Sequence, residues 1–178
     1  MGQPTAPLRI AQDDARGLLR TVAHDEAQGQ GQVVWTSSAG ELLVFVGALD
    51  LACAPGLVTV TVPVACDQVP SGTIIAVPFG VGRPGQVTGL VMSTIDRPTG
   101  PDPVVDAWAP SLTAYGWGAL LGVAVRVSAR AGAGLVPASI GADEAALLIL
   151  PTPNQPLPVL VPPARAVRAV ARIPGGIR

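Results

Sequence analysis

The segment "LVTVTVPV", residues 57–64, constrains the fold more than any other part of the chain. Valine recurs at every second position from Val58 to Val64, and leucine, threonine and proline fill the positions between. Successive side chains of a β-strand point to opposite faces of a sheet, so this alternation predicts a strand with one buried face. Pro63 has no N–H for a ladder hydrogen bond, which favours an edge strand or a strand end.

Further segments show the same strand-like composition and are joined by short connections. They cover residues 32–36, 41–46, 73–79, 86–92 and 122–129. Parallel strands need crossovers of a dozen or more residues, so these short connections predict antiparallel pairing. Ahead of the strands, apolar residues at helical spacing predict a helix over about 7–25. We therefore expect an α+β fold, in which the N-terminal helix packs on a twisted antiparallel, partly closed, β-barrel-like sheet with strands spanning about 32–150.

Three glycines in "FGVGRPGQVTG", residues 79–89, have the spacing G-x-G-x-x-G: Gly80, Gly82 and Gly85. A dinucleotide site with this spacing needs a helix directly after the glycines, because the pyrophosphate binds at the helix N-terminus. Here Pro84 interrupts the glycines and a valine-rich segment follows them. The motif therefore predicts a turn between two strands, and we expect no cofactor.

The residue inventory excludes several kinds of catalysis. The chain has no lysine, so Schiff-base chemistry and a P-loop lysine are ruled out. His24 is the single histidine, which excludes a metal site built from several histidines. Cys53 and Cys66 have neither the spacing of a zinc site nor that of a redox pair. We therefore predict no catalytic, cofactor-binding or metal-ligating residues.

Aromatic and acidic side chains gather in the second half of the chain. Three of the six aromatic residues lie within ten positions: Trp108, Tyr115 and Trp117. Tryptophan and tyrosine are preferred anchors at interfaces and pocket walls, but they also fill cores, and both interpretations stay open. A proline-rich loop just before them carries three carboxylates, Asp96, Asp102 and Asp106. These six residues form the candidate pocket or interface.

The C-terminal segment, residues 151–178, is predicted to be a proline-rich arm that follows a single domain over residues 1–150. Prolines favour extended polyproline geometry and a semi-rigid spacer. The segment is too apolar for an ordinary solvated linker, and its last fourteen residues carry four arginines and no acid. The predicted partner-binding residues of the arm are Leu157, Val159, Val161, Arg165, Arg168, Arg172 and Arg178.

Composition agrees with a protein that associates with itself or with another protein. Hydrophobic residues make up 49% of the chain and charged residues only 13%, so part of the outer surface is expected to be buried against other subunits. Residues 1–164 hold seven arginines against twelve acids, a net charge of −5, which argues against a nucleic-acid partner. No uninterrupted apolar run is long enough to span a membrane, and no secretory signal precedes the helix, so the predicted location is cytoplasmic.

The leading hypothesis is therefore a non-enzymatic structural or adaptor subunit of a homo-oligomeric or multi-protein assembly, which docks through its C-terminal arm. The alternative is a small-molecule-binding or enzymatic β-barrel domain. Its pocket would be walled by the three aromatic residues, with the three aspartates and Arg83 as polar groups. Native mass in solution discriminates between the two.

Overall fold

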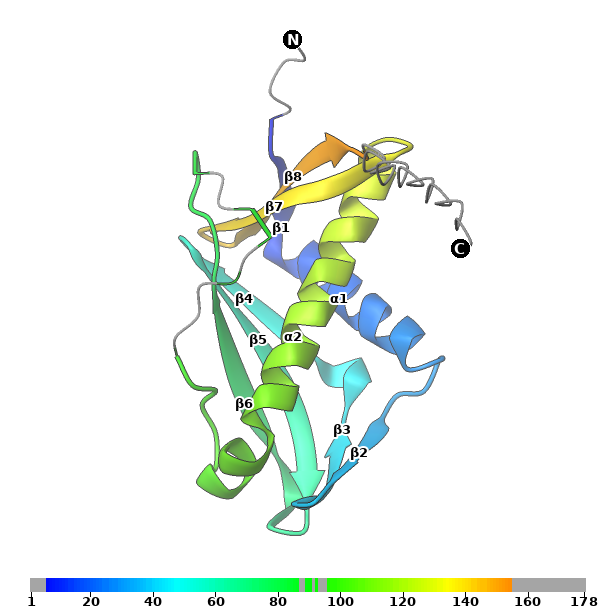
Figure 1. Cartoon of the computed structure of the whole chain (residues 1–178), viewed down its shortest axis with the longest axis vertical. Coiled ribbons are helices and arrows are strands. Elements are labelled where there is room, and N and C mark those ends of the chain that lie inside the picture. The colour runs from blue at the N-terminus through cyan, green and yellow to red at the C-terminus, as the bar shows by residue number, and fades with distance from the viewer. Residues whose placement is uncertain (1–5, 87–88, 91, 93–95, 155–178) are drawn as a thin grey trace, which may run out of the picture.

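A computed structural model describes residues 6–86, 89–90, 92 and 96–154. It contains two α-helices and two antiparallel sheets, so the mixed α+β class predicted from the sequence is confirmed (Figure 1). The elements in chain order are β1 (Leu8–Ala11), α1 (Gln12–Glu26), β2 (Val33–Ser37), β3 (Gly40–Val44), the 3-10 turn η1 (Val46–Ala48), β4 (Asp50–Ala54), β5 (Leu57–Cys66), β6 (Val69–Gly80), α2 (Asp102–Ala131), β7 (Leu135–Asp143) and β8 (Ala146–Pro153).

The larger sheet is built around β5. Strand β6 pairs with one side of β5, and β3 and β4 pair in succession with its other side, while β2 extends the sheet beyond β3. The alternating valines of β5 are fully buried, and Thr59 and Thr61 are half-buried on the opposite face. The alternation therefore identified the core face correctly.

Pro63 lies within this central strand rather than at an edge. Its carbonyl accepts a hydrogen bond from the Phe45 amide at 3.0 Å. Because the N and C=O of one residue in an antiparallel strand point to the same side, the Pro63 nitrogen also faces the side on which β3 and β4 pair with β5. On that side β3 ends at Val44 and β4 begins only at Asp50. A proline is tolerated there because the pairing changes from one strand to the other at this point.

The expectation of a partly closed barrel is wrong. Strands β1, β8 and β7 form a second, three-stranded sheet, and the two sheets do not close on each other. The segment that follows β6 reaches the second sheet through an isolated parallel bridge between Gly82 and Gly141 of β7. A Cβ on Gly141 would lie 2.9 Å from the Gly82 carbonyl oxygen, so this approach of the two backbones requires glycine. Gly82 of the G-x-G-x-x-G motif thus belongs to a contact between sheets.

The segment over residues 122–129 is helical, which corrects the strand predicted there. It forms the last part of α2, a helix of 30 residues that runs along one face of the larger sheet and ends beside β7 and β8 (Figure 1). Val123 and Val127 are buried one helical turn apart, and Val125 between them is 52% exposed. Valines at alternate positions therefore also fit a helix, because a helix can bury Val123 and Val127, which are four residues apart, and leave Val125 exposed.

Helix α1 is held to β4 by side chains as well as by apolar contacts. Arg16 and Arg20 donate from Nε to the carbonyls of Leu51 and Leu49, at 2.8 and 2.7 Å. The Gln12 side-chain oxygen accepts a hydrogen bond from the Cys53 amide at 2.7 Å. The helix starts later than the sequence suggested, because residues 8–11 pair with β8 as strand β1.

Strand β8 includes the first residues of the predicted arm. Pro151 and Pro153 lie opposite Pro137 and Leu135 of β7, beyond the last residue that β8 pairs with β1. This part of β8 has a partner on one side only, which is the setting in which a sheet accepts proline. The remainder of the arm, residues 155–178, lies outside the described residues.

By length and composition, α2 is long and apolar enough to cross a membrane. Within the described part of the chain, it is the only helix that meets these criteria. Of its most apolar window, 44% is buried inside the fold. A core helix of a soluble protein meets the same criteria, so this finding is weak support for a membrane span.

Candidate functional site

The first candidate is the face of the larger sheet that points away from α1 and α2. Within the described residues, both helices pack on the opposite face, which carries the buried valines of β5. The uncovered face carries apolar side chains in adjacent strands, and we call it the outer sheet face. Its members are Val34, Leu43, Phe45, Pro63, Ala65 and Ile74.

The strand register makes these side chains contiguous. Val34 lies opposite Leu43, Leu43 opposite Ala65, and Pro63 opposite Ile74. Val34 and Ile74 are 58% and 60% exposed, the two highest values among the large apolar residues described. A continuous exposed apolar surface of this kind is typical of a protein–protein contact.

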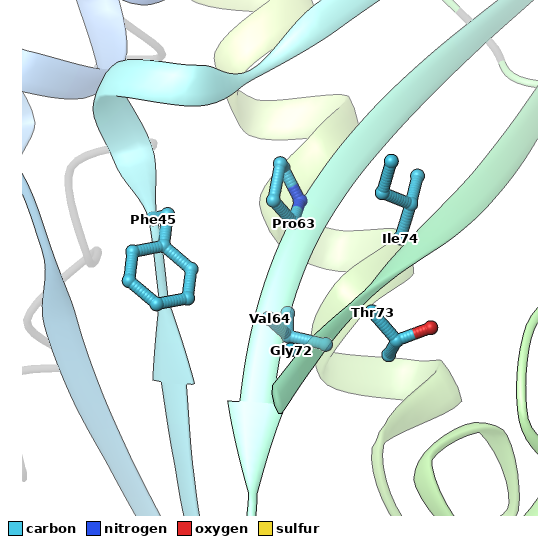
Figure 2. Close-up of a pocket in the computed structure, with 6 residues that line it drawn as sticks. All are labelled: Phe45, Pro63, Val64, Gly72, Thr73 and Ile74. Carbon is cyan, nitrogen blue, oxygen red and sulfur yellow. The ribbon is translucent and has the colours of Figure 1, made fainter. Parts of the chain in front are cut away.

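Two hollows lie on this face. The larger, of about 530 Å³, is lined by Phe45, which follows β3, by residues 63–64 of β5 and by residues 72–74 of β6. Figure 2 shows Phe45, Pro63 and Ile74 on the near side of the strands, with α2 behind them. The hollow lies beside the point at which the partner of β5 changes from β3, which ends at Val44, to β4, which begins at Asp50.

The second hollow, of about 340 Å³, adds negative charge to the apolar lining. It is lined by Val34, Glu41, Leu43, Ala65, Cys66, Asp67 and Pro70. Glu41 and Asp67 are exposed, and neither forms an ion pair within the part of the chain that the structure describes. The outer sheet face therefore combines apolar hollows with two unneutralised carboxylates.

The second candidate is an aromatic cluster that includes two of the predicted pocket residues. Trp35 of β2 lies 5.2 Å from Tyr115 and 6.4 Å from Trp108, measured between ring centroids. Trp108 is only 5% exposed and belongs to the core. Trp117 points elsewhere and packs on Phe79 at 5.6 Å, so the three predicted aromatic residues do not share one pocket.

Tyr115 and Trp35 line a pocket of about 180 Å³ at the C-terminal end of α1, which we call the aromatic pocket. The rest of its lining is Ala23, Glu26, Ala27, Val33 and Val46. Burial, with a smaller contribution from the Glu26 carboxylate, raises the pKa of Tyr115 to about 12. Its hydroxyl is buried and has no hydrogen-bond partner.

The three predicted aspartates do not line the aromatic pocket. Asp102 is the first residue of α2, Asp106 pairs with Arg97 on the surface, and Asp96 is exposed in the preceding loop. Across the described residues, no group of three or more histidine, cysteine, aspartate or glutamate side chains could hold a metal ion. The predicted combination of aromatic walls and these carboxylates is therefore not formed.

Sequence reasoning missed Trp35 and Glu26, which lie far from Tyr115 along the chain. Pairing of β2 with β3 and packing of α1 on α2 bring them to the pocket. The predicted arm residues, from Leu157 to Arg178, lie outside the described residues. Comparisons with family models, curated proteins and solved structures find no match for this chain.

Proposed function

We propose that this protein is a non-enzymatic assembly subunit whose outer sheet face binds the C-terminal segment, residues 155–178, of a second copy of the chain. The observation that carries the proposal is the contiguous apolar surface from Val34 to Ile74, which no described helix covers. An apolar segment that binds in hollows of this kind gains most of its affinity from burial of its aliphatic side chains.

The arm has side chains that match the hollows. Three aliphatic residues, Leu157, Val159 and Val161, lie within five positions, so one short segment carries all of them. Burying each of them contributes about 1.5–3 kcal/mol before the cost of ordering the segment is subtracted. That gain supports a reversible contact between folded subunits.

Charge supports the same pairing. Residues 155–178 carry four arginines and no acid, whereas residues 1–154 carry seven arginines and twelve acids. Glu41 and Asp67 at the second hollow are free to pair with arginines such as Arg165 and Arg168. Opposite charges at the rim of an interface increase the association rate and fix the orientation of the partner.

The arrangement of the chain favours a neighbouring copy over the same chain. Strand β8 ends at the three-stranded sheet, at the opposite end of the molecule from the tip of the β2–β3 hairpin (Figure 1). The prolines of residues 156–163 favour a semi-rigid extended spacer, at about 3.1 Å per residue. A stiff spacer favours contact with a neighbouring subunit over a return of the segment to its own sheet.

Native mass by sedimentation equilibrium tests the proposal. The monomer has a mass of 17.9 kDa, and we expect the full chain to sediment as a larger species. Val34→Asp and Ile74→Asp place a charge on the outer sheet face and should shift the protein towards monomer. Val125→Asp is the matched control, because Val125 is 52% exposed on α2, on the other side of the sheet.

An excess of a synthetic peptide of residues 155–178 should also dissociate the assembly, because it competes for the same hollows. A monomeric full chain would contradict the proposal. An assembly that neither the two outer-face substitutions nor the peptide weakens would contradict it as well, because the contact would then lie elsewhere.

A further inference from the structure

The aromatic pocket is formed by residues of α1, β2, η1 and α2. Ala23, Glu26 and Ala27 come from the last turn of α1, Val33 and Trp35 from β2, and Tyr115 from the middle of α2. Val46 completes the lining. The pocket is on the helix side of the larger sheet and is separate from the outer sheet face.

The two aromatic rings stand nearly at right angles. The ring planes of Trp35 and Tyr115 are inclined at 77° with centroids 5.2 Å apart, and Trp108 packs against Trp35 at 6.4 Å. Because Trp108 is buried in the core, it supports Trp35 in this position. An aromatic face carries partial negative charge and attracts cations, tryptophan most strongly.

Two further sources of negative potential lie at the same place. Glu26 is exposed and forms no ion pair with any described residue. It is also the last residue of α1, where the helix dipole places partial negative charge. The nearest arginine contact on this end of α1 pairs Arg126 with Asp25, so that cation is already neutralised.

The remaining lining selects among cations. Ala23, Ala27, Val33 and Val46 offer no side-chain hydrogen-bond acceptor. An ammonium group with three N–H donors would find a charged acceptor only at Glu26 and would lose its other hydrogen bonds to water, whereas a quaternary ammonium has no N–H to satisfy. The pocket, of about 180 Å³, is small for a ligand site, so it suits a compact ligand.

We propose that the aromatic pocket binds a compact quaternary ammonium ion, with its methyl groups on Trp35 and Tyr115 and its charge facing Glu26. Recognition then uses ring faces for the cation and one carboxylate for its charge, without a metal or covalent step.

Choline and its neutral carbon isostere, 3,3-dimethyl-1-butanol, test the proposal on the full chain. The two have the same shape and differ in charge, so calorimetric titration isolates the contribution of the cation. We expect saturable choline binding with a Kd of about 1 mM or tighter, and binding of the isostere roughly 2- to 30-fold weaker. Trp35 fluorescence, identified by its loss in Trp35→Phe, should change on choline binding.

Glu26→Gln should weaken choline binding several-fold and leave the isostere unaffected, because only the charged ligand interacts with the carboxylate. The matched control is Asp14→Asn, at the other end of the same helix, where no described ion pair is lost. Both side chains are exposed, so each variant should change the free energy of unfolding by no more than about 1 kcal/mol, the size of a charge–helix-dipole effect. Equal affinity for choline and the isostere, or no saturation by about 20 mM choline, would overturn the proposal.

Discussion

Two glycines of α2, two positions apart, should respond differently to the same substitution. Replacing a glycine within a helix by alanine stabilises the helix by about 1 kcal/mol when space is available. At Gly118 a Cβ has no neighbour within 4 Å, so Gly118→Ala should stabilise the protein by about that amount. At Gly116 the Cβ would lie 3.0 Å from Cζ and 3.1 Å from Cε2 of Phe79.

Phe79 cannot move away easily, because it is fully buried and packs on Trp117. Overpacking of this kind costs about 1–3 kcal/mol, which offsets or exceeds the helical gain of Gly116→Ala. The two variants should therefore differ by about 1–3 kcal/mol, or about 2–12 °C in Tm for a chain of this size. Thermal and urea unfolding followed by circular dichroism measure this difference.

A double variant identifies the cause. Phe79→Leu removes the ring edge that Gly116→Ala would approach, so in that background the alanine should become neutral or stabilising. If Gly116→Ala stabilised the wild-type chain as much as Gly118→Ala does, α2 would not pack on β6 through Gly116, and the reasoning would be refuted.

Three further predictions concern the core and the buried titratable groups. Val60→Asp places an unpaired charge in the core and should lower the free energy of unfolding by more than about 3 kcal/mol. Thr61→Asp on the opposite face should lower it by about 1 kcal/mol. Similar urea midpoints for the two variants would contradict the assignment of the two faces of β5. Burial and the Glu26 carboxylate raise the pKa of Tyr115, the single tyrosine, to about 12. Phenolate absorbance should therefore appear only above the usual pH, and the free energy of unfolding should fall as the pH rises from about 10 through 12. Titration of Tyr115 at the ordinary pKa would contradict its burial. Burial likewise raises the pKa of Cys53 from 9.0 to about 11, against a smaller opposing effect of Arg16. The thiolate fraction of Cys53 at pH 8 is then about 100-fold lower than in the unfolded chain. Its alkylation, measured by mass spectrometry, should be correspondingly slow.

Local patterns in the sequence predicted four of the five strands of the larger sheet, but neither β4 nor the long helix. The valines of β5 alternate over a complete strand, and burial of one face gives that alternation a single interpretation. Val123, Val125 and Val127 alternate over a shorter stretch, in which a strand and a helix that buries Val123 and Val127 fit equally well. Packing between the two sheets and α1 decides in favour of the helix.

The candidate sites depend even more on long-range contacts. Tyr115 and Trp108 were predicted, but their partner Trp35 reaches them from β2 only after the sheet forms. The outer sheet face likewise depends on the strand register, which places Val34, Leu43 and Ala65 side by side. A single segment of sequence contains no information about that register until the neighbouring strands are known.

Photocrosslinking from the arm tests the proposed assembly most directly. A photoreactive phenylalanine analogue in place of Val159, in the otherwise intact chain, reports which surface lies against the segment. We expect a covalent dimer. Mass spectrometry should find the crosslink on residues 34–45 or 63–74 of the other copy. Ile74→Asp should suppress formation of this dimer. Crosslinks confined to the monomer, or to residues outside the outer sheet face, would contradict the proposal that the arm binds there on a second copy.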